Sequence, residues 1–172
     1  AAGYHVRAPD QRGYGRSSGF STDYDAVLLP FGMHNLVRDA VALLDALGIR
    51  RAAAVVGHDF GSPVAAWCAL LHPERFASVM LMSAPFGGPP AAAAAGADIQ
   101  AALAALPRPR KHYQHHYGTR QANAEMWHAP QGVHAFLRAY YHVKSADWAP
   151  NQPYELQGWR ADQLAKMPEY YV

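Results

Sequence analysis

Short apolar runs alternate with segments of helical periodicity in the first half of the chain. Residues 34–48 place apolar side chains on one helical face, at Leu36, Ala40, Leu43, Leu44 and Leu47. Apolar runs at residues 54–56 and 78–83 predict buried strands, and residues 62–71 between them predict a helix. A further short strand is predicted at residues 4–8. Strands and helices that alternate at this pitch predict parallel βαβ units, and therefore an α/β fold.

The composition changes at Pro85, and the rest of the chain has a different organisation. Residues 85–98 are rich in proline, glycine and alanine, which is typical of a linker. Beyond them the chain is aromatic and polar, and residues 132–143 have one apolar helical face. We therefore predict two parts: a partial α/β core over residues 1–86, and a linker with a mostly helical segment over residues 87–172.

The composition is that of a globular protein, with 51% hydrophobic and 16% charged residues among 172. The formal net charge is +2, and the basic residues are scattered, which excludes a dense basic surface for nucleic acid. The single cysteine, Cys68, excludes an internal disulfide and is consistent with a reducing, cytoplasmic location. No uninterrupted apolar run is long enough to span a membrane. These features leave the oligomeric state open.

An acidic residue lies at the turn between a predicted strand and the helix that follows. The stretch VVGHDFGSPVAAW, residues 55–67, places Asp59 between Gly57 and Gly61 in a G-x-nucleophile-x-G pattern, with aspartate in the usual place of serine. Such a turn lifts the side chain at its tip clear of the sheet, and small neighbours let the backbone turn sharply. The alternative is that Asp59 only caps the helix that begins near Ser62.

An aspartate at this position selects a particular chemistry. A carboxylate is already an anion at neutral pH, so it can attack an sp³ carbon and form an ester, which water then hydrolyses at the carbonyl. The oxyanion formed in that hydrolysis needs backbone donors, and the N–H of Phe60 is one of two expected. We therefore predict Asp59 as the nucleophile and the Phe60 N–H as an oxyanion donor.

Three stretches together resemble α/β-hydrolases of the epoxide hydrolase group. They are GYHVRAPDQRGYGRSS, VVGHDFGSPVAAW and FASVMLMSAPF, and they lie within residues 3–86. Aspartate at the turn narrows the resemblance to the branch that contains epoxide hydrolases and dehalogenases. The resemblance implies a partial α/β-hydrolase fold followed by part of a helical lid. It identifies residues 87–172 as the linker and lid. Ser62 departs from the glycine that is frequent at its position in this family.

The resemblance also implies a lid tyrosine that hydrogen-bonds the epoxide oxygen. KHYQHHY, residues 111–117, matches the Tyr-Gln-x-x-Tyr-like context at Tyr113. A phenol can hold this oxygen and donate a proton as the ring opens. The alternative is that Tyr113 is an ordinary packing residue among ten tyrosines.

The expected reaction opens an epoxide with water to a vicinal diol through an Asp59 ester, without a cofactor. An apolar substrate is expected from the aromatic residues of the lid: Trp127, Tyr140, Tyr141 and Trp148.

Two other functions fit the same residues. Haloalkane dehalogenases usually follow the aspartate with tryptophan, and fluoroacetate dehalogenases with arginine, whereas the side chain of Phe60 has no N–H donor for a halide. A haloalkane or haloacid dehalogenase is therefore the alternative enzyme. A non-catalytic α/β-hydrolase-like binding protein, or an incomplete gene product, is the alternative from a different class.

The resemblance further implies parts that these residues do not supply. An oxyanion loop is expected before residue 1, and an acid, a histidine base and a second lid tyrosine are expected after the lid. Neither Tyr170 nor Tyr171 can be assigned to that last role. The chain is therefore expected to be truncated and not competent for turnover alone. His112 and His116 have the i, i+4 spacing of metal ligands, but no Asp, Glu or Cys lies in that cluster, so no metal site is predicted.

Overall fold

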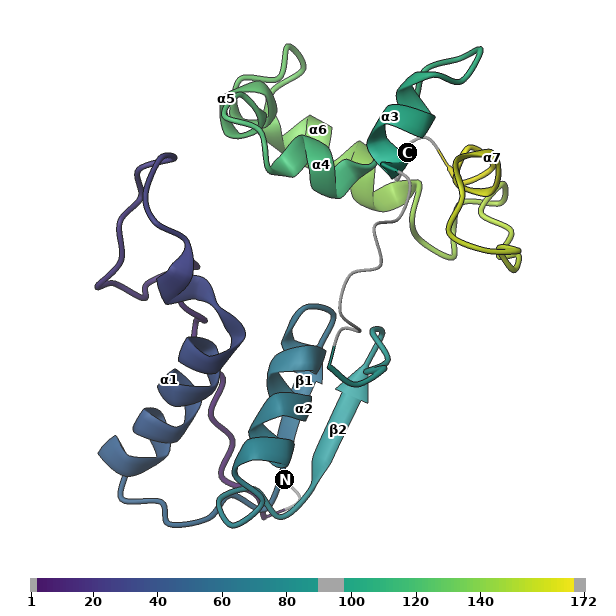
Figure 1. Ribbon diagram of the computed structural model, residues 1–172. Coiled ribbons are helices and arrows are strands. Elements are labelled where there is room, and N and C mark those ends of the chain that lie inside the picture. The colour runs from purple at the N-terminus through teal and green to yellow at the C-terminus, as the bar shows by residue number, and fades with distance from the viewer. Residues whose placement is uncertain (1–2, 90–97, 169–172) are drawn as a thin grey trace. The chain divides into compact units, whose positions relative to one another are not determined.

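The computed structural model describes residues 3–89 and 98–168 (Figure 1). The chain divides into two compact units, Ala1–Pro90 and Ala91–Val172, hereafter the first and second units. No helix within the described residues combines the length and apolar character needed to cross a bilayer. The predicted linker at residues 85–98 falls largely outside the described residues.

The first unit is a short α/β arrangement. Its elements in chain order are a 3₁₀ turn η1 (Leu29–Phe31), α1 (Met33–Ala46), β1 (Val55–His58), α2 (Gly61–Leu71) and β2 (Val79–Met82). The two strands are parallel, with Val55 opposite Val79 and His58 opposite Met82. Helix α2 connects them, as parallel strands require. The predicted α/β class is confirmed. The strands predicted at residues 54–56 and 78–83 and the helices predicted at residues 34–48 and 62–71 hold to within a few residues.

The core of the first unit lies where α1 and α2 pack together. Its buried members come from both helices and from the segment before β2: Leu36, Val37, Val64, Cys68 and Phe76. The α1 members lie on the apolar stripe that the sequence predicts. Helix α2 is apolar over most of its length, because it is covered both by α1 and by the strands.

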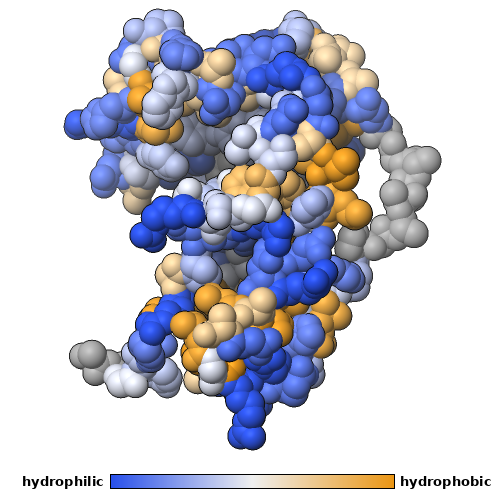
Figure 2. All heavy atoms as spheres, turned by 90° about the vertical axis from the view of Figure 1, so that its left-hand side faces the viewer, coloured by the Kyte–Doolittle hydropathy of each residue, from blue (hydrophilic) through white to orange (hydrophobic). Residues whose placement is uncertain are grey.

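The other face of the two-stranded sheet is exposed within the described residues. Side chains alternate across a strand, so Val56, Met80 and Met82 point away from the α2 side, where Val55 packs on the core. Their exposed fractions are 55%, 57% and 41%. Figure 2 presents the left-hand side of Figure 1, where α1 lies, and hydrophobic residues in orange are exposed among hydrophilic ones there as well. An apolar sheet face of this kind is a surface that further structure can cover.

The strand predicted at residues 4–8 is wrong. The structure has no strand there, and Tyr4 and Val6 are 75% and 74% exposed. A strand needs a neighbour to bond its N–H and C=O groups, and within the described residues β1 pairs only with β2. The local pattern of residues was therefore not sufficient to form the element.

In the second unit, residues 98–168 form short helices joined by turns and loops, with no strand among them. Its helices are α3 (Ile99–Ala104), α4 (Tyr113–Tyr117), α5 (Ala122–Trp127), α6 (Val133–His142) and α7 (Ala161–Leu164). Leu103 and Leu164 are fully buried against each other and form the centre of its core. The side chain of Asp98 caps α3 by accepting from the N–H groups of Gln100 and Ala101. The helix predicted over residues 132–143 is confirmed as α6.

Candidate functional site

Asp59 lies at the tip of the turn that joins β1 to α2. Its φ is +52°, in the left-handed region that few residues other than glycine adopt. The Asp59 N–H donates to the carbonyl of Met82 at 3.0 Å, which extends the strand pairing to the turn. The Ser62 N–H donates to the carbonyl of Asp59, also at 3.0 Å, which closes the turn. This left-handed turn is held by hydrogen bonds on both sides of Asp59.

Glycine is required at one end of the pattern and not at the other. A Cβ on Gly57 would lie 2.1 Å from the carbonyl oxygen of Gly61 and 2.7 Å from Cα of Ser62. Only a residue without a side chain lets the start of α2 approach the strand this closely. A Cβ on Gly61 would meet no heavy atom within 4 Å among the described residues. The expectation that small neighbours permit the sharp turn therefore applies to Gly57, and Gly61 is not needed for it.

The carboxylate of Asp59 is exposed, and its two oxygens have different surroundings. Oδ2 accepts a hydrogen bond from the Phe60 N–H at 2.7 Å, a short distance that is typical of a charge-assisted bond. Oδ1 has no hydrogen bond to any described residue. One oxygen is thus fixed by the backbone, and the other is available to a molecule that approaches from solvent.

Asp59 does not act as a side-chain cap of α2. The N-cap position is Phe60, and no side chain there accepts from the first N–H groups of the helix. A capping aspartate would accept from the N–H two or three residues further on, whereas Asp59 accepts from the adjacent Phe60. The alternative interpretation of Asp59 as a simple helix cap does not describe this turn.

Ser62 is a structural element of the turn that the sequence analysis missed. It is fully buried, and its hydroxyl lies 3.0 Å from the Gly57 carbonyl and 2.9 Å from the Met82 carbonyl. The Met82 N–H donates back to the same hydroxyl at 3.2 Å. One side chain therefore joins the ends of β1 and β2 directly below Asp59. The signal in the sequence is a polar residue in the first turn of an otherwise apolar helix.

Tyr113 is the first residue of α4, in the second unit, and is half-buried. Gln114 Nε2 lies 3.4 Å from its hydroxyl. Its ring lies 4.8 Å from that of His112 and 5.5 Å from that of Tyr117, measured between ring centroids. Tyr113 is thus held in an aromatic cluster at the start of a helix. Asp59 belongs to the first unit and Tyr113 to the second.

Two other tyrosines of the second unit form a polar network with Lys144. The hydroxyls of Tyr117 and Tyr140 are 3.0 Å apart, and Lys144 Nζ lies 3.1 Å from the Tyr140 hydroxyl. The same ammonium lies 4.2 Å from the centre of the Tyr140 ring, a cation–π distance. Trp127 and Tyr141 are each 64% exposed. The sequence showed the aromatic content of the second unit but not these contacts.

His112 and His116 of the second unit have separate environments. His112 is buried, whereas Nε2 of His116 lies 3.5 Å from a carboxylate oxygen of Glu125. In the described part of the chain no three His, Cys, Asp or Glu side chains come together as a metal ion would require. The i, i+4 spacing had made His116 a candidate metal ligand, but in the structure its side chain pairs with Glu125.

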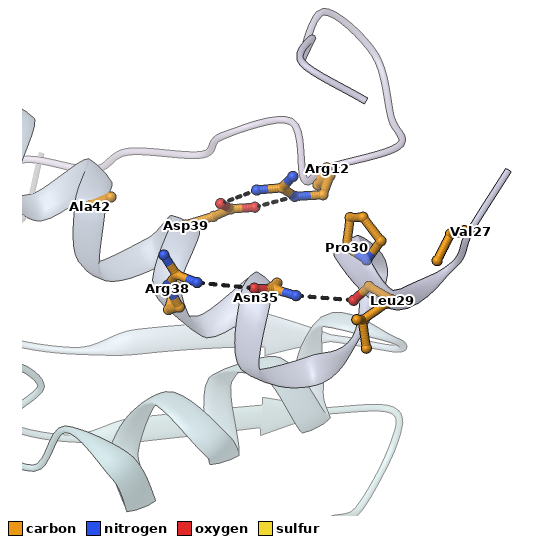
Figure 3. A pocket seen from close by; sticks show the side chains of 8 residues that line it. All are labelled: Arg12, Val27, Leu29, Pro30, Asn35, Arg38, Asp39 and Ala42. Carbon is orange, nitrogen blue, oxygen red and sulfur yellow. Dashed lines mark hydrogen bonds and ion pairs between the residues drawn. The ribbon is translucent and has the colours of Figure 1, made fainter. Parts of the chain in front are cut away.

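A pocket of about 510 Å³ lies in the first unit between the loop before α1 and α1 itself (Figure 3). Arg12 forms two hydrogen bonds to Asp39, at 2.8 and 2.6 Å, and this carboxylate raises the pKa of the guanidinium. These bonds attach the loop to α1. Asp59 is not among the lining residues, which are Arg12, Val27, Leu29, Pro30, Asn35, Arg38, Asp39 and Ala42. Asp59 therefore lies outside this pocket.

The first unit thus combines a parallel βαβ unit with an acidic residue at a left-handed turn. A family model described as alpha/beta hydrolase fold matches residues 1–108, and the chain belongs to this family. The resemblance found in the sequence is thereby confirmed.

Individual relatives show which α/β-hydrolases the chain is similar to. Epoxide hydrolase B of Mycobacterium tuberculosis is 49% identical over 87 residues, which cover 51% of this chain and 23% of that protein. Epoxide hydrolase A of the same organism is 46% identical over 84 residues, covering 49% and 24%. Rhodomycin D methylesterase DauP of Streptomyces sp. is 43% identical over 82 residues, covering 48% and 26%. The chain is thus similar to epoxide hydrolases, and its match spans about a quarter of the length of these relatives.

Proposed function

We propose that the intact protein is an epoxide hydrolase that opens an epoxide to a vicinal diol through an ester of Asp59. The observation that carries this proposal is the divided carboxylate of Asp59, with Oδ2 on the Phe60 N–H at 2.7 Å and Oδ1 without a partner among the described residues. The similarity to the epoxide hydrolases of M. tuberculosis supports the choice of substrate class.

The two oxygens would have different roles in the reaction. Oδ1 attacks an epoxide carbon, the C–O bond of the ring breaks, and the ring oxygen takes the electron pair. Oδ2 becomes the carbonyl oxygen of the ester. When water attacks that carbonyl, negative charge develops on Oδ2, where the Phe60 N–H already donates. A donor that is in place before the charge develops stabilises the transition state without reorganisation.

Tyr113 would hold the ring oxygen and supply its proton. This role follows from the KHYQHHY resemblance, and a fixed phenol at the start of α4 is compatible with it. Phe60 bears on the alternative carbon–halogen chemistry. Its side chain is 54% exposed at the turn and offers no N–H to a departing halide, so the same aspartate is better suited to an epoxide, whose oxygen needs a proton donor.

The test is to locate a covalent adduct. Incubating the protein with styrene oxide and digesting it should give a mass increase of one epoxide on the peptide that contains Asp59. Asp59→Asn should abolish this adduct, because an amide is a poor nucleophile, while asparagine tolerates the left-handed φ. Asp23→Asn, at another exposed aspartate, is the matched control and should retain it. An adduct confined to other carboxylates, or halide release from a haloalkane without epoxide opening, would overturn the proposal.

A further inference from the structure

His112 is the one histidine in the described residues that is buried, with 6% of its surface exposed. Its ring lies between two aromatic rings, with centroid distances of 4.8 Å to Tyr113 and 5.5 Å to Trp159. Its Nδ1 accepts a hydrogen bond from the Gln114 N–H at 3.4 Å and so caps the first turn of α4. His112 therefore contacts Tyr113 and also holds the backbone of the turn that carries it.

The cap requires the neutral form of His112. Nδ1 can accept from an N–H only while it has a free lone pair, and a protonated imidazole has two donors and no acceptor. Protonation would place an N–H of the ring against the N–H of Gln114 and would bury a positive charge. Both effects oppose protonation in the folded lid. Burial accordingly lowers the pKa of His112 below its ordinary value.

No nearby charge in the described residues compensates for a protonated ring. On the side of α7, Arg160 pairs with Asp162. On α4, His116 pairs with Glu125 of α5. Of the basic residues just before His112, Arg110 donates to the carbonyl of Met167. Lys111 is exposed and of the same charge as a protonated ring. The aromatic rings that contact His112 belong to Tyr113 and Trp159, and neither side chain brings a carboxylate to it.

We propose that neutral His112 is the positioning residue for Tyr113, so that the phenol is held for epoxide opening only while His112 is deprotonated. This inference rests on the proposed function for the role of Tyr113. Protonation would release the first turn of α4 and the ring of Tyr113 together. The lid would then lose its proton donor on the acid side, while Asp59, in the first unit, keeps its own hydrogen bonds.

The test compares three variants of the intact protein. His112→Asn keeps a side-chain acceptor at the cap but cannot titrate, and asparagine is a good N-cap residue. His112→Ala removes both the acceptor and the ring. His115→Asn is the matched control, since His115 is exposed on the same helix.

The first readout is independent of activity. In protein labelled with ¹⁵N-histidine, the ring signals that disappear in His112→Asn belong to His112. We expect this ring to stay neutral to a lower pH than an ordinary histidine, with Nδ1 as the unprotonated nitrogen. A His112 ring that titrates at or above the ordinary pKa of histidine, or that carries its proton on Nδ1, would overturn the inference.

The second readout is the pH profile of styrene oxide opening. We expect kcat of the wild type to fall on the acid side at the pH where His112 titrates, and this fall to be absent in His112→Asn and unchanged in His115→Asn. His112→Ala should lower kcat about tenfold above the pH where His112 titrates, a factor within the range for loss of one cap. Below that pH it should have no further effect, because the wild type has already lost the cap there. Identical profiles of wild type and His112→Asn would overturn the inference while leaving the proposed function intact. No activity in any form, with the ring titration as expected, would instead overturn the proposed function.

Discussion

The close approach of α2 to β1 gives a sharp prediction for Gly57→Ala. The added Cβ would lie 2.1 Å from the Gly61 carbonyl oxygen and 2.4 Å from the carbonyl carbon. Ordinary contacts between carbon atoms are about 3.5–4.0 Å. All three nearest atoms belong to the backbone of α2 and cannot rotate away. We therefore expect a loss of about 3 kcal/mol in the free energy of unfolding, at the upper end of the range for overpacking.

The chain offers a matched control within the same turn. A Cβ on Gly61 would meet no heavy atom within 4 Å among the described residues, and the φ of Gly61 is not in the left-handed region. Gly61→Ala should therefore be neutral or stabilising by about 0.4–1 kcal/mol, because alanine loses less entropy on folding. The two variants make the same chemical change four residues apart and are expected to have opposite signs.

Equilibrium urea denaturation of both variants measures this difference directly. Far-ultraviolet circular dichroism follows the helices, and the fluorescence of Trp67, which lies on α2 and contacts Phe86, follows the first unit. Similar unfolding midpoints for Gly57→Ala and wild type would refute the claim that the turn requires glycine at this end. Equal destabilisation by both variants would refute the distinction between the two glycines.

Two further predictions concern buried groups of α2. Ser62→Ala should lower the free energy of unfolding by about 1–3 kcal/mol, because backbone groups of Gly57 and Met82 lose their hydroxyl partner; an unchanged urea midpoint would contradict this. Burial raises the pKa of the Cys68 thiol to about 11, so at pH 8 iodoacetamide should label it only after urea unfolds the protein. Fast labelling of the native protein would show that the thiol is accessible.

Elements with a strong periodic pattern could be predicted from the sequence. The stripe of α1, the apolar runs of β1 and β2 and the amphipathic face of α6 are local patterns that burial then reinforces. The strand expected at residues 4–8 has an equally good local pattern but finds no neighbouring strand among the described residues. Strand formation depends on a distant partner, which a single segment of sequence does not reveal.

In the candidate site, too, some features could be predicted from the sequence and others could not. The position of Asp59 at a sharp strand-to-helix turn follows from the G-x-D-x-G spacing and from the elements on either side. The contacts of Ser62 and His112 could not be predicted, because both depend on the direction of one side chain and on residues far along the chain. Ser62 reaches Met82, twenty residues away, and His112 lies against Trp159. Composition indicates that such residues are present but not which atoms they contact.

The unequal oxygens of Asp59 have a consequence for the direction of approach. Rotation of the carboxylate about its Cβ–Cγ bond would break the bond from the Phe60 N–H, so the outward lone pairs keep one orientation before any molecule arrives. An incoming electrophile therefore meets a single reactive atom on one side of the turn. The carboxylate therefore loses its rotational entropy when the protein folds, and not when the substrate binds.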